Sequence, residues 1–384
     1  MLLVTTSYPL REESVSGIFV KKLVDALKHH VNITVVTPAD DNVPTDSDVK
    51  CARYAPRNMQ LLSHRPGGIP VALRKSPLAW LLLPSLIISM FCQCIAQCRN
   101  KDVIIANWSI NGVIAGVVAK LFDIPLITVL RGSDVNADNG KTKRSFVLSL
   151  AIQLSAKVVC VSETFYREML STYSVDKNKF VMIPNGVDCE YLKIKHPIDN
   201  SSIELTTVGN LNVKKGVHVI VEALALLRNG DKQIFLNVIG DGPEKKRLMR
   251  LSESLGVADN VNFIGNIPHS EVFGYLKNTN IFVFSSYSEG RANVLLEAMA
   301  SGLPIVASDI EANQELIKHR DNGYLFETGE PHDLADKLTR LIESKAIRKQ
   351  LGLSARKYIE INGLSWSVTG EKYNKLLVSC VGHV

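Results

Sequence analysis

Two carboxylates lie eight positions apart in the segment SEGRANVLLEAMASGLP, residues 288–304. The pattern places Glu289 in a loop after the apolar run IFVFSS, and Glu297 on the apolar face of the helix that follows. A carboxylate in such surroundings is costly unless something pairs with it or hydrogen-bonds it. Its oxygens can accept hydrogen bonds from a vicinal diol, so Glu297 suits a ribose and Glu289, further out, suits a hexose. The alternative, a surface helix with a solvated Glu297, fits poorly with the apolar residues around it.

The same segment offers backbone N–H groups to an anion. We expect Asn293 to cap the helix, so that the N–H groups from Arg291 to Val294 are presented at its N-terminus. The positive end of the helix dipole favours a negative ligand there.

Glycines and lysines follow other predicted strands. Gly17 opens the first helix, Gly209 with Lys214 or Lys215 follows the run LTTV, and Gly240 follows FLNVI. A glycine lets the backbone approach an anion closely, and a lysine can project toward a phosphate. Taken alone, solvated lysines explain the second loop equally well, and a plain turn explains the third loop better.

Short apolar runs of strand length alternate with longer helical patterns along the whole chain. Six such runs precede the polar segment 188–202, and six follow it. This alternation predicts an α/β fold with two parallel sheets, each covered by helices on both faces. We predict one domain at residues 1–190 and a second at 200–365. Two doubly wound, Rossmann-like domains facing a central cleft would place a ligand at the carboxyl ends of their strands.

Composition agrees with a two-domain globular protein. The chain has 384 residues, of which 46% are apolar and 21% charged. The start reads as a first β-strand and not as a signal peptide. Seven cysteines without framework spacing suit a reducing compartment, and the cytoplasm is expected. The CxC-x3-C group at residues 92–98 lacks a second ligand pair, so we assign Cys92, Cys94 and Cys98 to core packing and not to a metal.

The net charge of +6 is unevenly placed, because residues 1–190 carry 21 basic and 16 acidic side chains. This excess indicates an anionic partner such as a membrane face, although solvated surface charge is an equal explanation. An uncharged stretch, residues 77–98, follows Arg65, Arg74 and Lys75. Its length would span a bilayer. Proline, serine and glutamine dilute it, and a strand pattern follows at once, so a packed or interfacial helix is favoured over a span.

The chain resembles a retaining glycosyltransferase of family 4, the group with the GT-B fold, over nearly its full length. The motifs that carry the resemblance are SEGRANVLLEAMASGLPIVAS, VGNLNVKKG, VIGDGPEKKRL, PNGVD and the RGSD at residues 131–134. Each is moderately specific, and their order and spacing together are strong. The resemblance implies a nucleotide sugar held mainly by the C-terminal domain and an acceptor held by the N-terminal domain. It also implies a last helix, residues 366–384, that crosses back to the N-terminal domain.

By this resemblance Glu297 holds the ribose hydroxyls, Glu289 faces the donor sugar, and Lys215 holds the diphosphate with help from Gly17 across the cleft. Together with Arg131, the residues Glu289 and Lys215 are the expected catalytic groups. The other expected donor-binding residues are Asn210, Lys214, Gly240, Ile264, Gly290, Arg291, Ala292, Asn293 and Val294. The expected acceptor-binding residues are Asn107, Trp108, Ser133 and Asp134.

Three positions depart from the family pattern. Many members have Arg where this chain has Asn210, and His where it has Arg131, so Arg131 could supply the charge that Asn210 lacks. Many members also have a functional His where this chain has Asn107, and an asparagine cannot shuttle a proton. In a retaining transfer the departing diphosphate can itself take the acceptor's proton.

We therefore predict a glycosyltransferase that uses a nucleoside-diphosphate sugar and acts on a lipid-linked or glycan acceptor in the assembly of a bacterial surface polysaccharide, such as lipopolysaccharide O-antigen, capsule or exopolysaccharide. It is expected in the cytoplasm, peripheral on the anionic inner face of the membrane, with no nucleic-acid partner. No metal or other cofactor is expected, because Lys215, Arg131 and helix N-termini can meet the diphosphate charge. Two rival hypotheses remain: a non-catalytic sugar-nucleotide-binding subunit, favoured by Asn107 and Asn210 but opposed by the two glutamates, and an epimerase of similar fold.

Overall fold

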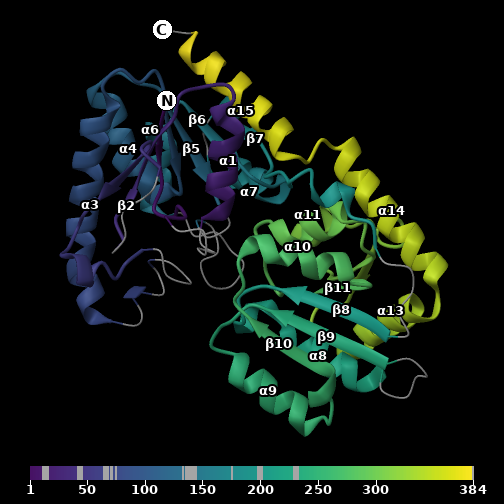
Figure 1. The fold of residues 1–384 in the computed structure, drawn as a ribbon. Coiled ribbons are helices and arrows are strands. Elements are labelled where there is room, and N and C mark those ends of the chain that lie inside the picture. Colours follow the sequence, from purple (N-terminus) through teal and green to yellow (C-terminus); the bar gives the residue numbers. More distant parts are fainter. Residues whose placement is uncertain are drawn as a thin grey trace. The chain divides into compact units, whose positions relative to one another are not determined.

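A computed structural model describes the chain at residues 1–10, 17–40, 46–63, 69, 72–73, 76–131, 134, 145–173, 176–196, 202–227 and 233–382. The chain divides into two compact units (Figure 1). The N-terminal unit comprises Met1–Asn185 and Trp366–Val384, and the C-terminal unit comprises Gly186–Ser365. Tyr191 and Ile194, from the polar segment between the two repeats of the pattern, are buried in the C-terminal unit.

The N-terminal unit holds, within the described ranges, a seven-stranded sheet in the order β3-β2-β1-β4-β5-β6-β7. All neighbouring strands are parallel. The strands are β1 (Leu2–Val4), β2 (Thr34–Pro38), β3 (Val49–Ala52), β4 (Ile104–Asn107), β5 (Leu126–Leu130), β6 (Lys157–Cys160) and β7 (Phe180–Met182). The pattern did not predict β3, because its four residues, VKCA, contain a lysine and form no apolar run.

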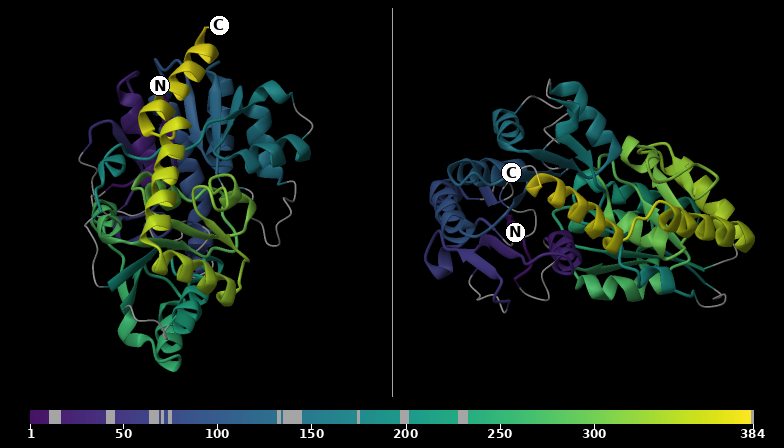
Figure 2. Two further views of the ribbon diagram at one scale, coloured as in Figure 1. Left: turned by 90° about the vertical axis from the view of Figure 1, so that its right-hand side faces the viewer. Right: turned by 90° about the horizontal axis from the view of Figure 1, so that it is seen from above.

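Helices cover both faces of this sheet. They are α1 (Ile18–Lys28), α3 (Pro77–Cys98), α4 (Ser109–Leu121), α6 (Phe146–Leu154), α7 (Glu163–Thr172) and α15 (Trp366–Val381), with short 3₁₀ turns η1 (Arg57–Met59) and η2 (Lys177–Lys179). Successive strand residues point to opposite faces, so Leu3 packs with α1 and α15 while Leu2 packs with α3 and α4. Figure 2 shows α15, the last helix of the chain, lying beside α1.

Helix α3 coincides with the uncharged stretch. It packs on the sheet through one side, where Met90, Cys94 and Cys98 are buried. Two of its serines hold it to the preceding segment, because Ser85 Oγ donates to the carbonyl of Tyr54 at 2.5 Å and Ser89 Oγ donates to that of Arg53 at 2.6 Å. These contacts are those of a helix packed on a folded unit.

The other side of α3 is exposed and apolar. Trp80, Leu81 and Ile88 are 60%, 75% and 62% exposed. In the described part of the chain, α3 is the one helix whose length and hydropathy would suffice to cross a membrane, on those two criteria alone. Cys92 is exposed, so its assignment to the core is wrong, whereas that of Cys94 and Cys98 is confirmed.

The C-terminal unit repeats the architecture. Its described residues form a six-stranded parallel sheet in the order β10-β9-β8-β11-β12-β13. The strands are β8 (Ser202–Val208), β9 (Gln233–Ile239), β10 (Val261–Gly265), β11 (Ile281–Phe284), β12 (Ile305–Ser308) and β13 (Tyr324–Phe326). The helices are α8 (Val217–Leu226), α9 (Lys245–Ser254), α10 (His269–Asn278), α11 (Asn293–Ala300), α12 (Glu311–Gln314), α13 (Pro331–Glu343) and α14 (Lys345–Ile361), with 3₁₀ turns η3 (Tyr191–Lys193), η4 (Val213–Lys215) and η6 (Ala258–Asn260).

Alternation along β11 shows how the second sheet is sandwiched. Ile281 and Val283 join the core formed with α8, α9 and α13, whereas Phe282 and Phe284 join the core formed with α10, α11 and α14. The central strands are therefore buried on both faces, as their unbroken apolar runs require. The predicted fold class, two doubly wound parallel-sheet units, is confirmed.

Candidate active site

Two loops at the carboxyl ends of the neighbouring strands β8 and β11 are locked together in the C-terminal unit. Gly216 follows η4 with φ +59°, and a Cβ there would lie 2.3 Å from the carbonyl oxygen of Ser285. Only glycine allows this approach. Ser285 Oγ donates to the carbonyl of Lys215 at 2.9 Å, and the N–H of Tyr287 donates to the carbonyl of Lys214 at 2.8 Å. The position of Lys215 is thus fixed from the β11 side.

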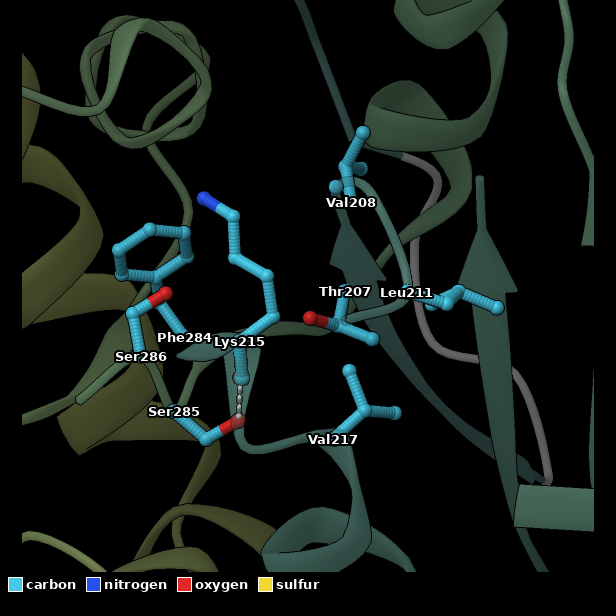
Figure 3. A pocket seen from close by; sticks show the side chains of 9 residues that line it. Thr207, Val208, Leu211, Lys215, Val217, Phe284, Ser285 and Ser286 are labelled. Carbon is cyan, nitrogen blue, oxygen red and sulfur yellow. Dashed lines mark hydrogen bonds between the residues drawn. The ribbon is translucent and has the colours of Figure 1, made fainter. Parts of the chain in front are cut away.

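Lys215 and Glu289 form an ion pair at this place. The ammonium Nζ lies 2.5 Å from Glu289 Oε1 and 5.3 Å from the centre of the Phe284 ring. Figure 3 shows the lysine side chain rising beside that ring at the edge of a small cavity, which residues 207–209, Leu211, Val217 and residues 284–286 also line. Both charged side chains are mostly buried, so the pair explains why a carboxylate is tolerated in this loop. Lys214 is exposed to solvent.

Three further loop ends pack backbone against backbone. Gly240 has φ +128°, and a Cβ there would lie 2.0 Å from the carbonyl oxygen of Gly209. The N–H of Gly240 donates to the carbonyl of Gly265, at the end of β10 beside the half-buried Ile264. Asn210 is exposed, with its carboxamide beside Gly242. The carboxyl ends of β8, β9 and β10 therefore form one continuous backbone surface.

The helix that follows Glu289 begins without a side-chain cap. Asn293 is the first residue of α11 and Ala292 occupies the capping position, so the expectation that Asn293 caps this helix is wrong. The methyl group of Ala292 cannot accept a hydrogen bond. Arg291, in the loop just after Gly290, is buried 3.5 Å from Glu315; burial lowers the pKa of its guanidinium, while the charge of Glu315 opposes that shift.

Glu297 lies in the second turn of α11, close after Val294, and is 8% exposed. Its Oε1 lies 2.8 Å from Nε2 of His269, the first residue of α10. Sequence reasoning did not predict His269, because 28 residues separate the two side chains and no local pattern links them. The proline before it and the helical pattern after it indicate only that a helix begins there.

In the N-terminal unit, the expected acceptor residues lie at the carboxyl ends of β4 and β5. Asn107 ends β4 and is fully buried, and Trp108 follows with φ +69° and ψ 151°. The carboxylate of Asp134 accepts from the N–H and Oγ of Ser109 and from the N–H of Arg131, all between 2.7 and 2.9 Å. Burial raises the pKa of Asp134 even though these hydrogen bonds lower it. Ser133 lies outside the described residues.

Arg131 is buried among carboxamides. Nη1 donates to Asn185 Oδ1 at 2.8 Å, Nη2 donates to Asn107 Oδ1 at 3.0 Å, and the guanidinium lies 4.4 Å from the centre of the Phe19 ring. Burial lowers its pKa to about 10, so the group remains charged at neutral pH. The structure therefore shows what Arg131 binds within its own unit, and its role toward a diphosphate stays a prediction.

Gly17 precedes the first residue of α1 and has φ +76°. A Cβ at this position would lie 2.5 Å from the carbonyl oxygen of Ser7, so the backbone at the end of β1 passes directly against the start of the helix. Such a turn needs glycine. The geometry presents the N-terminus of α1 at the carboxyl edge of the sheet.

Two doubly wound parallel-sheet units, one of which holds a Lys–Glu ion pair and a buried glutamate at its strand carboxyl ends, define the class of glycosyltransferases with the GT-B fold. Family models agree with this class. The model of glycosyl transferases group 1 matches residues 190–358, and that of glycosyltransferase family 4 matches residues 16–191. The chain belongs to glycosyltransferase family 4, whose members are retaining transferases that use nucleotide-sugar donors.

The similarity to known proteins extends over most of the chain. N-acetyl-alpha-D-glucosaminyl L-malate synthase of Bacillus anthracis is 27% identical over 276 residues, covering 69% of this chain and 71% of that protein. The capsular polysaccharide biosynthesis glycosyltransferase CapM of Staphylococcus aureus is 23% identical, covering 74% and 80%. The crystal structure of HepE from Anabaena in complex with UDP superposes with a TM-score of 0.74 at 17% identity, covering 98% and 99%. At that identity HepE shows the fold alone.

Proposed function

We propose that this protein transfers a sugar from a nucleoside-diphosphate sugar to a lipid-linked or glycan acceptor during assembly of a bacterial surface polysaccharide. The observation that carries the proposal is the Lys215–Glu289 ion pair at the carboxyl ends of β8 and β11, with Glu297 buried on the next helix. CapM supports the polysaccharide setting, since its name assigns it to capsule biosynthesis.

The donor binds to the C-terminal unit in this proposal. The ammonium of Lys215 carries three N–H groups and shares one with Glu289, so it has donors to offer a diphosphate. The N-terminus of α11 has no capping side chain among the described residues. The positive end of the helix dipole at this N-terminus attracts the same anion. Glu289 faces the hydroxyls of the donor sugar, and Glu297 accepts from the ribose diol.

Transfer proceeds with retention at the anomeric carbon. The bond from that carbon to the β-phosphate oxygen breaks while the bond to the acceptor oxygen forms on the same face, and the acceptor's proton passes to the departing diphosphate. Lys215 stabilises the negative charge that develops on the leaving group. This route requires no proton shuttle at Asn107, which an asparagine cannot supply.

The acceptor binds to the N-terminal unit, where Trp108 has a backbone conformation that only glycine adopts readily. A non-glycine residue held in this region costs about 1–3 kcal/mol and occurs mainly at functional sites. The indole packs edge-on against Phe19, at 5.9 Å between ring centres. The strained turn holds the indole at the strand end, as a flat apolar surface suited to a sugar ring.

The same unit brings the enzyme to its lipid-linked acceptor. The exposed apolar residues of α3, Trp80, Leu81 and Ile88, suit the interfacial region of a bilayer. Arg65, Arg74 and Lys75, which lie outside the described residues, precede that helix in the sequence and add attraction to anionic lipid. These features support the proposed location on the inner face of the cytoplasmic membrane.

A donor panel tests the proposal. Purified protein is incubated with UDP-, GDP-, ADP- and dTDP-linked labelled sugars and with lipid extracts that contain polyprenyl-linked saccharides. Transfer of label into the lipid phase, with the new bond keeping the donor's anomeric configuration by NMR, is the expected result. Saturable nucleotide-sugar binding without any transfer would instead indicate a non-catalytic sugar-nucleotide-binding subunit, and a changed sugar released on the nucleotide would indicate an epimerase.

A further inference from the structure

A histidine holds one oxygen of the buried glutamate in the C-terminal unit. His269 Nε2 lies 2.8 Å from Glu297 Oε1, and the two side chains are 28% and 11% exposed. A carboxylate accepts only, so the imidazole carries its hydrogen on Nε2 and donates it. The contact satisfies one oxygen of Glu297 and leaves the other as an acceptor.

The two helices that carry this pair are packed together. Val272 and Leu276 of α10 and Leu295 and Leu296 of α11 belong to one buried cluster on the same face of the sheet. The backbones beneath both side chains are therefore fixed by core packing. Because the backbones are fixed, the remaining freedom is rotation of the glutamate side chain, and the hydrogen bond from the histidine restricts that rotation.

We propose that His269 is a positioning residue for nucleotide binding: it donates to Oε1 of Glu297 and thereby aims Oε2 at the ribose diol of the donor. This inference rests on the proposed role of Glu297 in donor binding. A group that orients a ligand-binding side chain in the free protein raises affinity, because less side-chain conformational entropy is lost when the ligand binds. The effect of His269 is therefore confined to ligands that have ribose hydroxyls.

The experiment measures binding of UDP and of 2′,3′-dideoxy-UDP by isothermal titration calorimetry, with the guanosine and adenosine pairs run in parallel. The variants are His269→Ala, His269→Gln and Glu297→Ala. The control is His332→Ala, which removes an exposed histidine from the first turn of α13 in the same unit. Thermal unfolding of each variant reports whether the fold is kept.

We expect His269→Ala to weaken ribonucleotide binding about tenfold, as for loss of a hydrogen bond to a charged group, and to leave dideoxynucleotide binding nearly unchanged. The glutamine of His269→Gln keeps an N–H donor and restores most of the preference for ribose. His332→Ala changes neither affinity. A histidine that served only the fold would weaken both ligands equally, and glutamine would not rescue it.

The experiment distinguishes failure of the positioning role of His269 from failure of the proposed role of Glu297. If Glu297→Ala abolishes the ribose preference while His269→Ala keeps it, or if His269→Ala weakens both ligands alike, the positioning role is overturned and the proposed function stands. If the wild-type protein binds ribonucleotide and dideoxynucleotide equally, or binds none of them, then the role of Glu297 fails and the inference fails with it.

Discussion

The guanidinium of Arg131 donates to the side-chain oxygen of Asn107 across 3.0 Å inside the N-terminal unit. By the family resemblance, both residues stand where many members have histidine, so the two expected departures from the family pattern contact one another. The same guanidinium donates to Asn185 at 2.8 Å, in the PNGVD segment at the end of the unit. The arginine thus ties the carboxyl ends of β4 and β5 to the last residue of the unit's first segment.

Replacing Arg131 by methionine should destabilise the N-terminal unit. The change removes the charged donor from the Asn107 and Asn185 oxygens, and each lost hydrogen bond to a charged group costs about 1.5–3 kcal/mol. Removing a buried cation offsets part of this, so we expect a net loss of about 2 kcal/mol in the free energy of unfolding. Urea denaturation measures it, with Arg167→Met as a control because that arginine is 76% exposed. Equal midpoints for Arg131→Met and the wild type would contradict a structural role.

Lys215→Met should reduce turnover strongly. The variant loses the cation expected to stabilise the leaving diphosphate, a contribution worth about 10²–10³ in rate for one such donor. It also leaves Glu289 without its partner, 2.5 Å away in the wild type. The rate of sugar transfer at saturating donor is the measurement, and Lys246→Met, an exposed lysine on α9, is the control. A loss confined to donor affinity, with turnover unchanged, would refute stabilisation of the leaving group.

Alanine variants of the two glutamates should affect different properties, nucleotide affinity for Glu297 and turnover for Glu289. Glu297→Ala should weaken nucleoside-diphosphate binding by about 1.5–3 kcal/mol, the value for hydrogen bonds to a charged group. Glu289→Ala should lower turnover more than nucleotide affinity, because its carboxylate faces the sugar. Calorimetry with the free diphosphate and initial rates with the full donor separate the two effects. The assignment of roles is refuted if both variants lose affinity for the free diphosphate equally.

The fold was predictable because strand and helix periods alternate without interruption. Buried parallel strands such as Ile281–Phe284 must be apolar on both faces, and this requirement is visible in the sequence as an unbroken run of apolar residues. Strand β3 was not predicted because it lies at the edge of the sheet, where a strand is less buried and needs fewer apolar residues. Its residues Lys50 and Cys51 are only half-buried. The carboxyl-edge location of Lys215 and Glu289 follows from the same alternation.

The contacts of the candidate site were not predictable in the same way. The pairing of Lys215 with Glu289 depends on the order of β8 and β11 in the sheet, and that of His269 with Glu297 depends on how α10 packs on α11. Neither order nor packing leaves a local signature in the sequence. Asn293 is an example at a helix end. As a capping residue it would have to precede the helix, but α11 begins at Asn293 itself and Ala292 takes the capping position.

Catalysis should be independent of divalent metal. The diphosphate charge is expected to be met by Lys215 and by the N-terminus of α11, so removing metal ions should leave turnover largely intact. Transfer rates in EDTA, compared with rates in magnesium and in manganese, test this expectation. Full loss of activity in chelator, restored by either ion, would show that a metal carries the charge instead.

The N-terminal unit should bind anionic membranes through α3. Leu81 and Ile88 are 75% and 62% exposed on an apolar helix side, and each basic residue near an anionic surface adds on the order of 1 kcal/mol. Flotation with anionic and with neutral vesicles should show selective binding to the anionic ones. That binding should weaken at high salt, which screens surface charge within about 10 Å at moderate ionic strength.

Two sets of variants separate the apolar and the electrostatic parts of this binding. Charge reversal by Arg74→Glu and Lys75→Glu should remove the preference for anionic vesicles, whereas Leu81→Ser with Ile88→Ser should lower binding to both kinds. Ile361→Ser is the matched control, because this isoleucine of α14 is 72% exposed but belongs to the C-terminal unit. A helix that spans the bilayer would resist both high salt and alkaline washing, so retention after both treatments would replace peripheral docking with insertion. Equal flotation with both vesicle types, unchanged by the charge reversal, would refute electrostatic docking by this unit.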